Sequence, residues 1–118
     1  MARILVIDDI DFTRQTISAM IKRGGHEVLE ASNGKLGLLS FEENKPDLVV
    51  TDILMPEMEG LETIKRMKHS QPHVPIIAIT GSTDSPFMKI ALKFGAVKGL
   101  YKPFKQAELL SEINKHVA

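Results

Sequence analysis

Strand-like segments alternate with helical patterns along the whole chain, and this alternation restricts the fold more than any other feature. Five short segments have the length and composition of strands: residues 3–7, 27–31, 47–51, 76–80 and 97–101. The segments that follow each of them place apolar residues at the three-to-four-residue spacing of a helix. Regular alternation of this kind predicts an α/β fold, with a parallel sheet covered by helices on both faces.

Glycine and proline residues mark the limits of the predicted helices. The first helix covers residues 10–23, and two glycines directly after it favour a helix end. The second helix ends before Pro46, and the third covers residues 61–69. Ser85 and Pro86 are typical of a helix N-cap and a first helical residue, so they predict the start of the fourth helix.

Composition excludes several classes of protein. The chain has 118 residues, the length of a single domain, and no linker or repeat divides residues 1–118. The absence of cysteine excludes disulfides and thiolate metal sites. No apolar run approaches the roughly 20 residues of a membrane span, and the early aspartates are unlike a signal peptide, so we expect a cytoplasmic protein. Basic residues form no dense stripe interleaved with aromatics, so we expect no direct nucleic-acid binding.

Polar side chains stand where four of the five predicted strands end. Asp8 and Asp9 follow the first strand, Asp52 follows the third, Thr80 ends the fourth and Lys102 follows the fifth. Each has an ordinary explanation when taken alone: a helix cap, a turn residue, strand propensity or a surface lysine. The carboxyl ends of parallel strands meet at one edge of a sheet, however, and ligands bind there in open α/β sheets. Their joint arrival at this edge therefore predicts a functional site.

Three neighbouring carboxylates favour a bound cation. Each pair repels by about 4 kcal/mol at 4 Å and an effective dielectric of 20. Oxygen ligands alone select a hard divalent ion, most often Mg²⁺. A carboxylate beside such an ion can act as a nucleophile toward a phosphoryl donor. Lys102 and Thr80 have the groups needed to hold phosphoryl oxygens.

These residues resemble the receiver domain of two-component response regulators, in its chemotaxis-type single-domain form. The resemblance covers the whole chain, residues 1–118, and five pieces carry it together. They are Asp8-Asp9 after the first strand, Asp52 after DLVVT, MPEMEG at residues 55–60, Thr80 after IIAI, and Lys102-Pro103-Phe104. The family implies a flavodoxin-like doubly wound sheet of five parallel strands in the order 2-1-3-4-5, with five helices.

The resemblance also implies a role for each site residue. Asp52 would accept a phosphoryl group from a histidine kinase or a histidine phosphotransferase. Asp9, Asp52 and the backbone carbonyl of Leu54 would bind Mg²⁺ directly, while Asp8 would act through water. Thr80 and Lys102 would contact the phosphoryl group, and the Lys102–Pro103 peptide would be cis. The protein would then be a signalling switch that catalyses only its own phosphorylation and dephosphorylation.

One part of the family pattern is missing. The family usually has an aromatic residue three places before the lysine, and this chain has Gly99 there. Tyr101 lies on the same side of the strand by alternation; we expect it to pack in the core, and a role as the switch residue is the alternative. Leu54 and Ser82 occupy two positions that influence the lifetime of the phosphoryl group in this family.

The fourth helix, fifth strand and fifth helix form the usual output surface of the family. In this chain that surface carries five candidate contact residues: Lys89, Lys93, Lys98, Lys105 and Tyr101. They are either ordinary solvated side chains or a basic face that binds an acidic downstream protein or a second copy.

Three other functions compete with this interpretation. A phosphohydrolase of the haloacid dehalogenase type also uses an aspartyl-phosphate, but it usually has a second Asp where Leu54 stands, together with a cap domain. A nucleotide- or flavin-binding module would need a Gly- or Ser/Thr-rich loop, where this chain has Asp8-Asp9-Ile10-Asp11. A degenerate receiver that takes no phosphoryl group is the third possibility.

Overall fold

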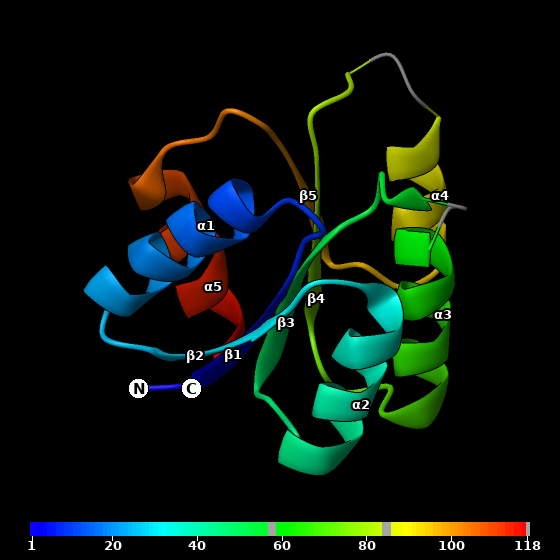
Figure 1. The fold of residues 1–118 in the computed structure, drawn as a ribbon, viewed down its shortest axis with the longest axis horizontal. Helices are drawn as coiled ribbons and strands as arrows, with labels where there is room; N and C mark the ends of the chain where they lie inside the picture. The colour runs from blue at the N-terminus through cyan, green and yellow to red at the C-terminus, as the bar shows by residue number, and fades with distance from the viewer. Residues whose placement is uncertain (57–58, 84–85, 118) are drawn as a thin grey trace.

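A computed structural model describes residues 1–56, 59–83 and 86–117, and its five strands form one parallel sheet (Figure 1). The strands lie in the order β2-β1-β3-β4-β5, and every neighbouring pair is parallel. Their bounds are β1 Arg3–Ile7, β2 Glu27–Ala31, β3 Leu48–Asp52, β4 Ile76–Thr80 and β5 Lys98–Tyr101. The predicted doubly wound fold and its strand order are confirmed.

Helices cover both faces of this sheet. Figure 1 shows α1 and α5 on one side and α2, α3 and α4 on the other. Their bounds are α1 Asp11–Arg23, α2 Gly34–Asn44, α3 Glu59–Ser70, α4 Phe87–Lys93 and α5 Gln106–His116. Each face therefore has its own hydrophobic core. Among the described residues, no helix is both long and apolar enough to cross a membrane.

Alternating side chains of each central strand point to different cores. In β1, Leu5 and Ile7 join the core under α2, α3 and α4, whereas Ile4 and Val6 join the core under α1 and α5. This two-sided burial explains why β1, β3 and β4 read as nearly continuous apolar runs. The edge strands β2 and β5 are more exposed, which agrees with their more polar sequences.

The helix ends differ from the predictions by one or two residues. The third helix begins at Glu59 rather than residue 61, and β3 extends to Asp52 because Asp52 pairs with Ile79 in the ladder. Pro86 lies just before α4, which begins at Phe87, and the predicted Ser85 cap lies outside the described residues. These shifts leave the site residues at the same edge of the sheet.

Candidate functional site

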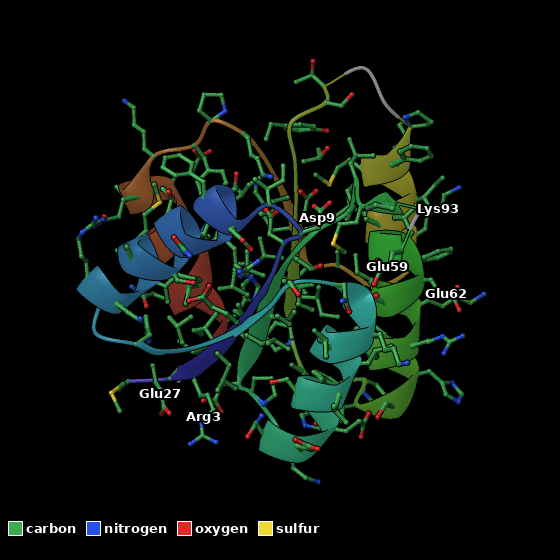
Figure 2. All side chains as sticks on the ribbon, in the orientation of Figure 1. Arg3, Asp9, Glu27, Glu59, Glu62 and Lys93 are labelled. Carbon is green, nitrogen blue, oxygen red and sulfur yellow. The ribbon has the colours of Figure 1, made fainter. Side chains whose placement is uncertain are left out.

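Three carboxylates lie together at the carboxyl ends of β1 and β3. One oxygen each from Asp8, Asp9 and Asp52 forms a group in which all atoms lie within 4.8 Å of one another. The two strands are adjacent, and Ile7 pairs with Thr51, so the residues that follow emerge side by side. Asp8 and Asp52 are buried, whereas Asp9 is exposed and lies near the upper end of the sheet in Figure 2. The predicted convergence of these three residues is therefore present.

Lys102 connects two of the three carboxylates. Its Nζ lies 3.1 Å from Asp8 Oδ2 and 3.0 Å from Asp52 Oδ2. The lysine follows β5, so its side chain reaches past β4 to contact the ends of β1 and β3. The Lys102–Pro103 peptide is cis, as the family resemblance implied. Charge-assisted hydrogen bonds of this length are among the stronger ones in proteins.

Burial and ion pairing have opposite effects on the pKa values of Asp52 and Lys102. Burial raises the pKa of Asp52, and hydrogen bonds from Lys102 and the Leu54 amide offset only part of that effect. Burial lowers the pKa of Lys102, but the hydrogen bonds and charges of Asp52 and Asp8 outweigh it, so the pKa of Lys102 is raised overall. The Lys102 ammonium is therefore held charged. The three clustered carboxylates carry more negative charge than this one ammonium neutralises.

The segment after β3 orients Asp52. The Leu54 N–H donates to Asp52 Oδ1 at 2.9 Å, and the Thr51 hydroxyl donates to the Asp52 carbonyl at 3.0 Å. Gly60 of α3 lies against this backbone, since a Cβ added there would come within 2.5 Å of the Ile53 Cα. This role of Gly60 was not predicted from the sequence, where its signal was a glycine shortly after the predicted nucleophile.

Asp8 is held from the α1 side. Its Oδ1 accepts the Ile10 N–H at 2.9 Å, and Arg14 donates to its carbonyl at 2.9 Å. Arg14 also pairs with Asp11 and Glu30, so it anchors the loop that carries the acidic residues. Sequence reasoning missed Arg14, because an arginine in the first turns of a helix carries no distinctive signal. Within the described part of the chain, no side-chain hydrogen bond caps α1, so neither Asp8 nor Asp9 acts as its N-cap.

Thr80 lies at the same edge of the sheet, and its hydroxyl is hydrogen-bonded to the segment that follows β4. It is buried at the end of β4, and the residue before it pairs with Asp52. Its hydroxyl accepts the Ser82 N–H at 3.2 Å, and among the described residues this is its hydrogen-bond partner. Leu54 is partly exposed and contributes its amide to Asp52.

The expectation for Tyr101 is wrong. Its side chain is 42% exposed and does not belong to either core. Tyr101 is the last residue of the edge strand β5, and neither α4 nor another described element buries its side chain. Gly99, on the same side of β5, is instead covered by Met88 of α4, whose side chain occupies the space of a Cβ at that position.

We expect Gly99→Tyr to lower the free energy of unfolding by about 1 to 3 kcal/mol, because the new side chain overlaps Met88. Met88→Ala removes the overlapping atoms, so the double variant is expected to recover part of this loss. Urea unfolding of both single variants and the double variant measures the coupling. Strictly additive losses would contradict the proposed overlap.

The predicted basic face is exposed. Lys89 and Lys93 lie on α4, Lys98 begins β5 and Lys105 precedes α5 (Figure 2 labels Lys93). Three apolar side chains of the same region are also about two-fifths exposed: Leu92, Val97 and Tyr101. The region therefore combines positive charge with apolar contact area.

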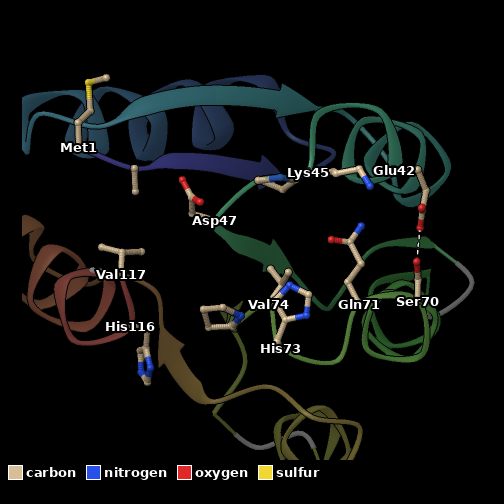
Figure 3. Close-up of a pocket in the computed structure, with 13 residues that line it drawn as sticks. Met1, Glu42, Lys45, Asp47, Ser70, Gln71, His73, Val74, His116 and Val117 are labelled. Atoms are coloured by element: carbon tan, nitrogen blue, oxygen red, sulfur yellow. Dashed lines mark hydrogen bonds between the residues drawn. The ribbon is translucent and has the colours of Figure 1, made fainter.

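A cavity lies at the opposite end of the sheet from the acidic group. It has a volume of about 700 Å³ and is bordered by side chains such as Asp47, His73 and His116 (Figure 3). None of the three clustered aspartates lines it, and neither does Lys102. The site predicted at the carboxyl ends of the strands is thus separate from this cavity.

Comparisons with known proteins agree with this geometry. The family described as "Response regulator receiver domain" matches residues 4–114. The chain is 35% identical to the chemotaxis protein CheY of Thermotoga maritima, over 96% of this chain and 95% of that protein. It is 36% identical to the chemotaxis protein CheY of Bacillus subtilis, with the same coverage of both.

A solved structure gives the same result for the fold. A response regulator receiver domain protein from Clostridium thermocellum superposes with a TM-score of 0.92 and 37% identity. The match covers 98% of this chain and 94% of that one. The similarity therefore extends over nearly the entire length of both molecules.

Proposed function

The chain belongs to the response regulator receiver domain family, and from this premise we propose that Asp52 is its phosphoacceptor. The chain is a signalling domain of the CheY type, a switch controlled by phosphorylation. The observation that carries the assignment of Asp52 is its carboxylate, which is buried, grouped with Asp8 and Asp9, and in contact with Lys102. We further propose that residues 1–118 act as one receiver unit.

The acidic group fits a hard divalent cation. Its three nearby ligand atoms are carboxylate oxygens, and among the described residues Lys102 is the cation that hydrogen-bonds to them. Three negative charges therefore face one positive charge. We assign Asp8, Asp9, Asp52 and the backbone carbonyl of Leu54 as the residues that hold Mg²⁺, the ion that such oxygen sets select. When bound, Mg²⁺ supplies charge neutralisation for the phosphoryl oxygens.

The proposed reaction is a transfer between a phosphohistidine and Asp52. An oxygen of the Asp52 carboxylate attacks the phosphorus, the P–N bond of the phosphohistidine breaks, and its electron pair stays on the imidazole nitrogen. Lys102 holds a phosphoryl oxygen as a point charge, and Thr80 donates its hydroxyl hydrogen to another. The donor is a histidine kinase or a histidine phosphotransferase.

Thr80 links the proposed reaction to the rest of the molecule. Its hydroxyl accepts the Ser82 N–H, and a hydroxyl that turns toward the phosphoryl group gives up that bond. The segment from Thr80 leads into α4, which carries Lys89 and Lys93 of the basic face. We therefore propose that phosphorylation changes how the α4–β5–α5 face binds a downstream protein or a second copy. The exposed lysines, together with Tyr101, favour an acidic partner surface there.

The phosphohydrolase alternative has less support. The two similar CheY proteins are chemotaxis proteins, and Leu54 stands where the hydrolases have their second acid. Its side chain supplies no proton to a leaving group, so a rapid second step has no general acid at this position. Multiple turnover of a small phosphate ester would favour the hydrolase instead.

We expect the protein to gain one phosphoryl group when it is incubated with Mg²⁺ and acetyl phosphate, and to gain none when a chelator is present. Intact mass spectrometry measures the gain directly. A protein that takes no phosphoryl group from acetyl phosphate or from a phosphorylated histidine phosphotransferase would contradict the proposed function. A gain that persists in the chelator would contradict the metal requirement.

A further inference from the structure

The first turn of α3 lies between the backbone of Asp52 and the start of α2 and contacts both. Gly60 lies against the Asp52 carbonyl and Ile53, and the preceding residue, Glu59, points to α2 (Figure 2). The Thr63 hydroxyl donates to the Glu59 carbonyl at 2.7 Å, which reinforces this turn from within the helix. Because Gly60 has no side chain, the helix can approach the phosphoacceptor backbone this closely.

Glu59 supplies hydrogen-bond acceptors to the first amides of α2. Its Oε1 accepts the N–H of Gly34 and, at 3.2 Å, the N–H of Lys35. The next amide along α2, the Leu36 N–H, donates to Asn33 Oδ1 at 2.8 Å. The first N–H groups of a helix have no partner within the helix, and a carboxylate is favourable there. Glu59 therefore ties two helices together by satisfying groups that would otherwise be unpaired.

Gly34 allows this contact to form. A Cβ added at Gly34 would lie within 2.8 Å of both Glu59 Cγ and Glu59 Oε1. Glycine at residue 34 and glycine at residue 60 thus leave room on both sides of the same helical turn. Contact runs without a break from the α2 amides through Glu59 and Gly60 to the backbone of Asp52.

The position of this turn bears on the Asp52 carboxylate. Asp52 Oδ1 accepts the Leu54 N–H, and Leu54 lies in the short segment between β3 and α3. β3 fixes one end of the segment, because the Ile53 N–H donates to the Ile79 carbonyl at 3.0 Å. Gly60 packs against the same peptide from the α3 side, since a Cβ added at Gly60 would come within 2.9 Å of the Ile53 carbonyl carbon, which is bonded to the Leu54 nitrogen. A displacement of the first turn of α3 would therefore release the peptide that carries the Leu54 N–H to move relative to the carboxylate that it orients.

We propose that Glu59 is a positioning residue for phosphoryl transfer. Its hydrogen bonds to α2 hold the first turn of α3 against Asp52, and they thereby keep the Leu54 amide on the phosphoacceptor carboxylate. Glu59 itself touches no reacting atom. The inference rests on the proposed function of Asp52 and adds the residue that maintains the orientation of its carboxylate.

Three variants test this role. Glu59→Ala removes the acceptor, whereas Glu59→Gln keeps an oxygen that can accept both α2 amides. The control is Glu62→Ala, one turn further along α3, where the carboxylate is exposed and pairs with Arg66. Each variant is compared with the wild type by the rate constant of phosphorylation from acetyl phosphate with Mg²⁺, by urea unfolding, and by hydrogen exchange of the Leu54 amide in NMR spectra.

We expect Glu59→Ala to phosphorylate roughly tenfold more slowly under conditions where it stays folded, because small misplacements of reacting groups are costly. Its Leu54 amide is expected to exchange faster, while Glu59→Gln and Glu62→Ala remain close to the wild type. A wild-type rate and wild-type Leu54 exchange in folded Glu59→Ala would overturn the proposal, even if that variant is less stable. The exchange measurement needs no phosphoryl donor, so it tests the role of Glu59 even if the wild type takes no phosphoryl group.

Discussion

Asp52→Asn is expected to abolish the phosphoryl gain in Mg²⁺ and acetyl phosphate, a loss on the order of 10⁴-fold or more in rate. A carboxylate oxygen is an anionic nucleophile, whereas the side-chain amide of asparagine carries no charge and is a poor one. Intact mass spectrometry of the treated variant is the measurement.

The matched control is Asp47→Asn, at the other end of the sheet. Asp47 Oδ2 accepts the Arg3 N–H at 2.8 Å, and an asparagine oxygen can still accept that bond. The control is therefore expected to gain a phosphoryl group as the wild type does. A gain on Asp52→Asn would show that another side chain, such as the exposed Asp9, accepts the group. Urea unfolding of both variants separates lost chemistry from lost structure.

The strand pattern predicted most of the site because parallel topology turns a linear pattern into a spatial one. Once the strands alternate with helices, their carboxyl ends share one edge, and residues as far as 94 positions apart in the sequence become neighbours. This is why Asp8, Asp9 and Asp52 can be grouped from the order of the strands alone. Their ion-pairing lysine joins the group because it also follows a strand.

Residues that support the site could not be predicted in the same way. Arg14, Glu59 and Met88 act through side chains that cross between elements, and sequence spacing gives no direction for such contacts. Glu59 reaches α2 across 25 positions, and its target is a backbone amide that any residue other than proline could supply. Gly60 can be read from the sequence, but the reason that a glycine is required there is the close packing of α3 on the Asp52 backbone, which only the structure shows.

Tyr101 shows a different limit of sequence reasoning. Strand alternation placed it on the same side as Gly99, and burial was then inferred from that side. Whether a side is covered depends on the length and position of the neighbouring helix, and α4 covers Gly99 through Met88 at the edge of the sheet. Alternation therefore predicts the direction of a side chain and leaves its burial to tertiary packing.

Lys102→Ala is expected to affect stability, metal affinity and reactivity in three different ways. Asp8 and Asp52 are almost completely buried, and the variant removes the cation that hydrogen-bonds to both, so we expect a loss of about 2 to 3 kcal/mol in the free energy of unfolding without metal. Mg²⁺ is expected to bind more tightly, because it no longer competes with the ammonium for the same oxygens. Urea unfolding and Mg²⁺ titration calorimetry measure these two changes.

Phosphorylation of Lys102→Ala is nevertheless expected to be about 10²- to 10³-fold slower, even at saturating Mg²⁺, because a charged donor to the phosphoryl oxygens has been lost. Opposite changes in metal affinity and rate distinguish this prediction from a simple disruption of the site, which would lower both. Lys105→Ala is the control, since Lys105 is exposed and lies outside the acidic group. A Lys102→Ala variant that binds Mg²⁺ more tightly and reacts at the wild-type rate would show that the lysine balances charge at rest but takes no part in the transfer.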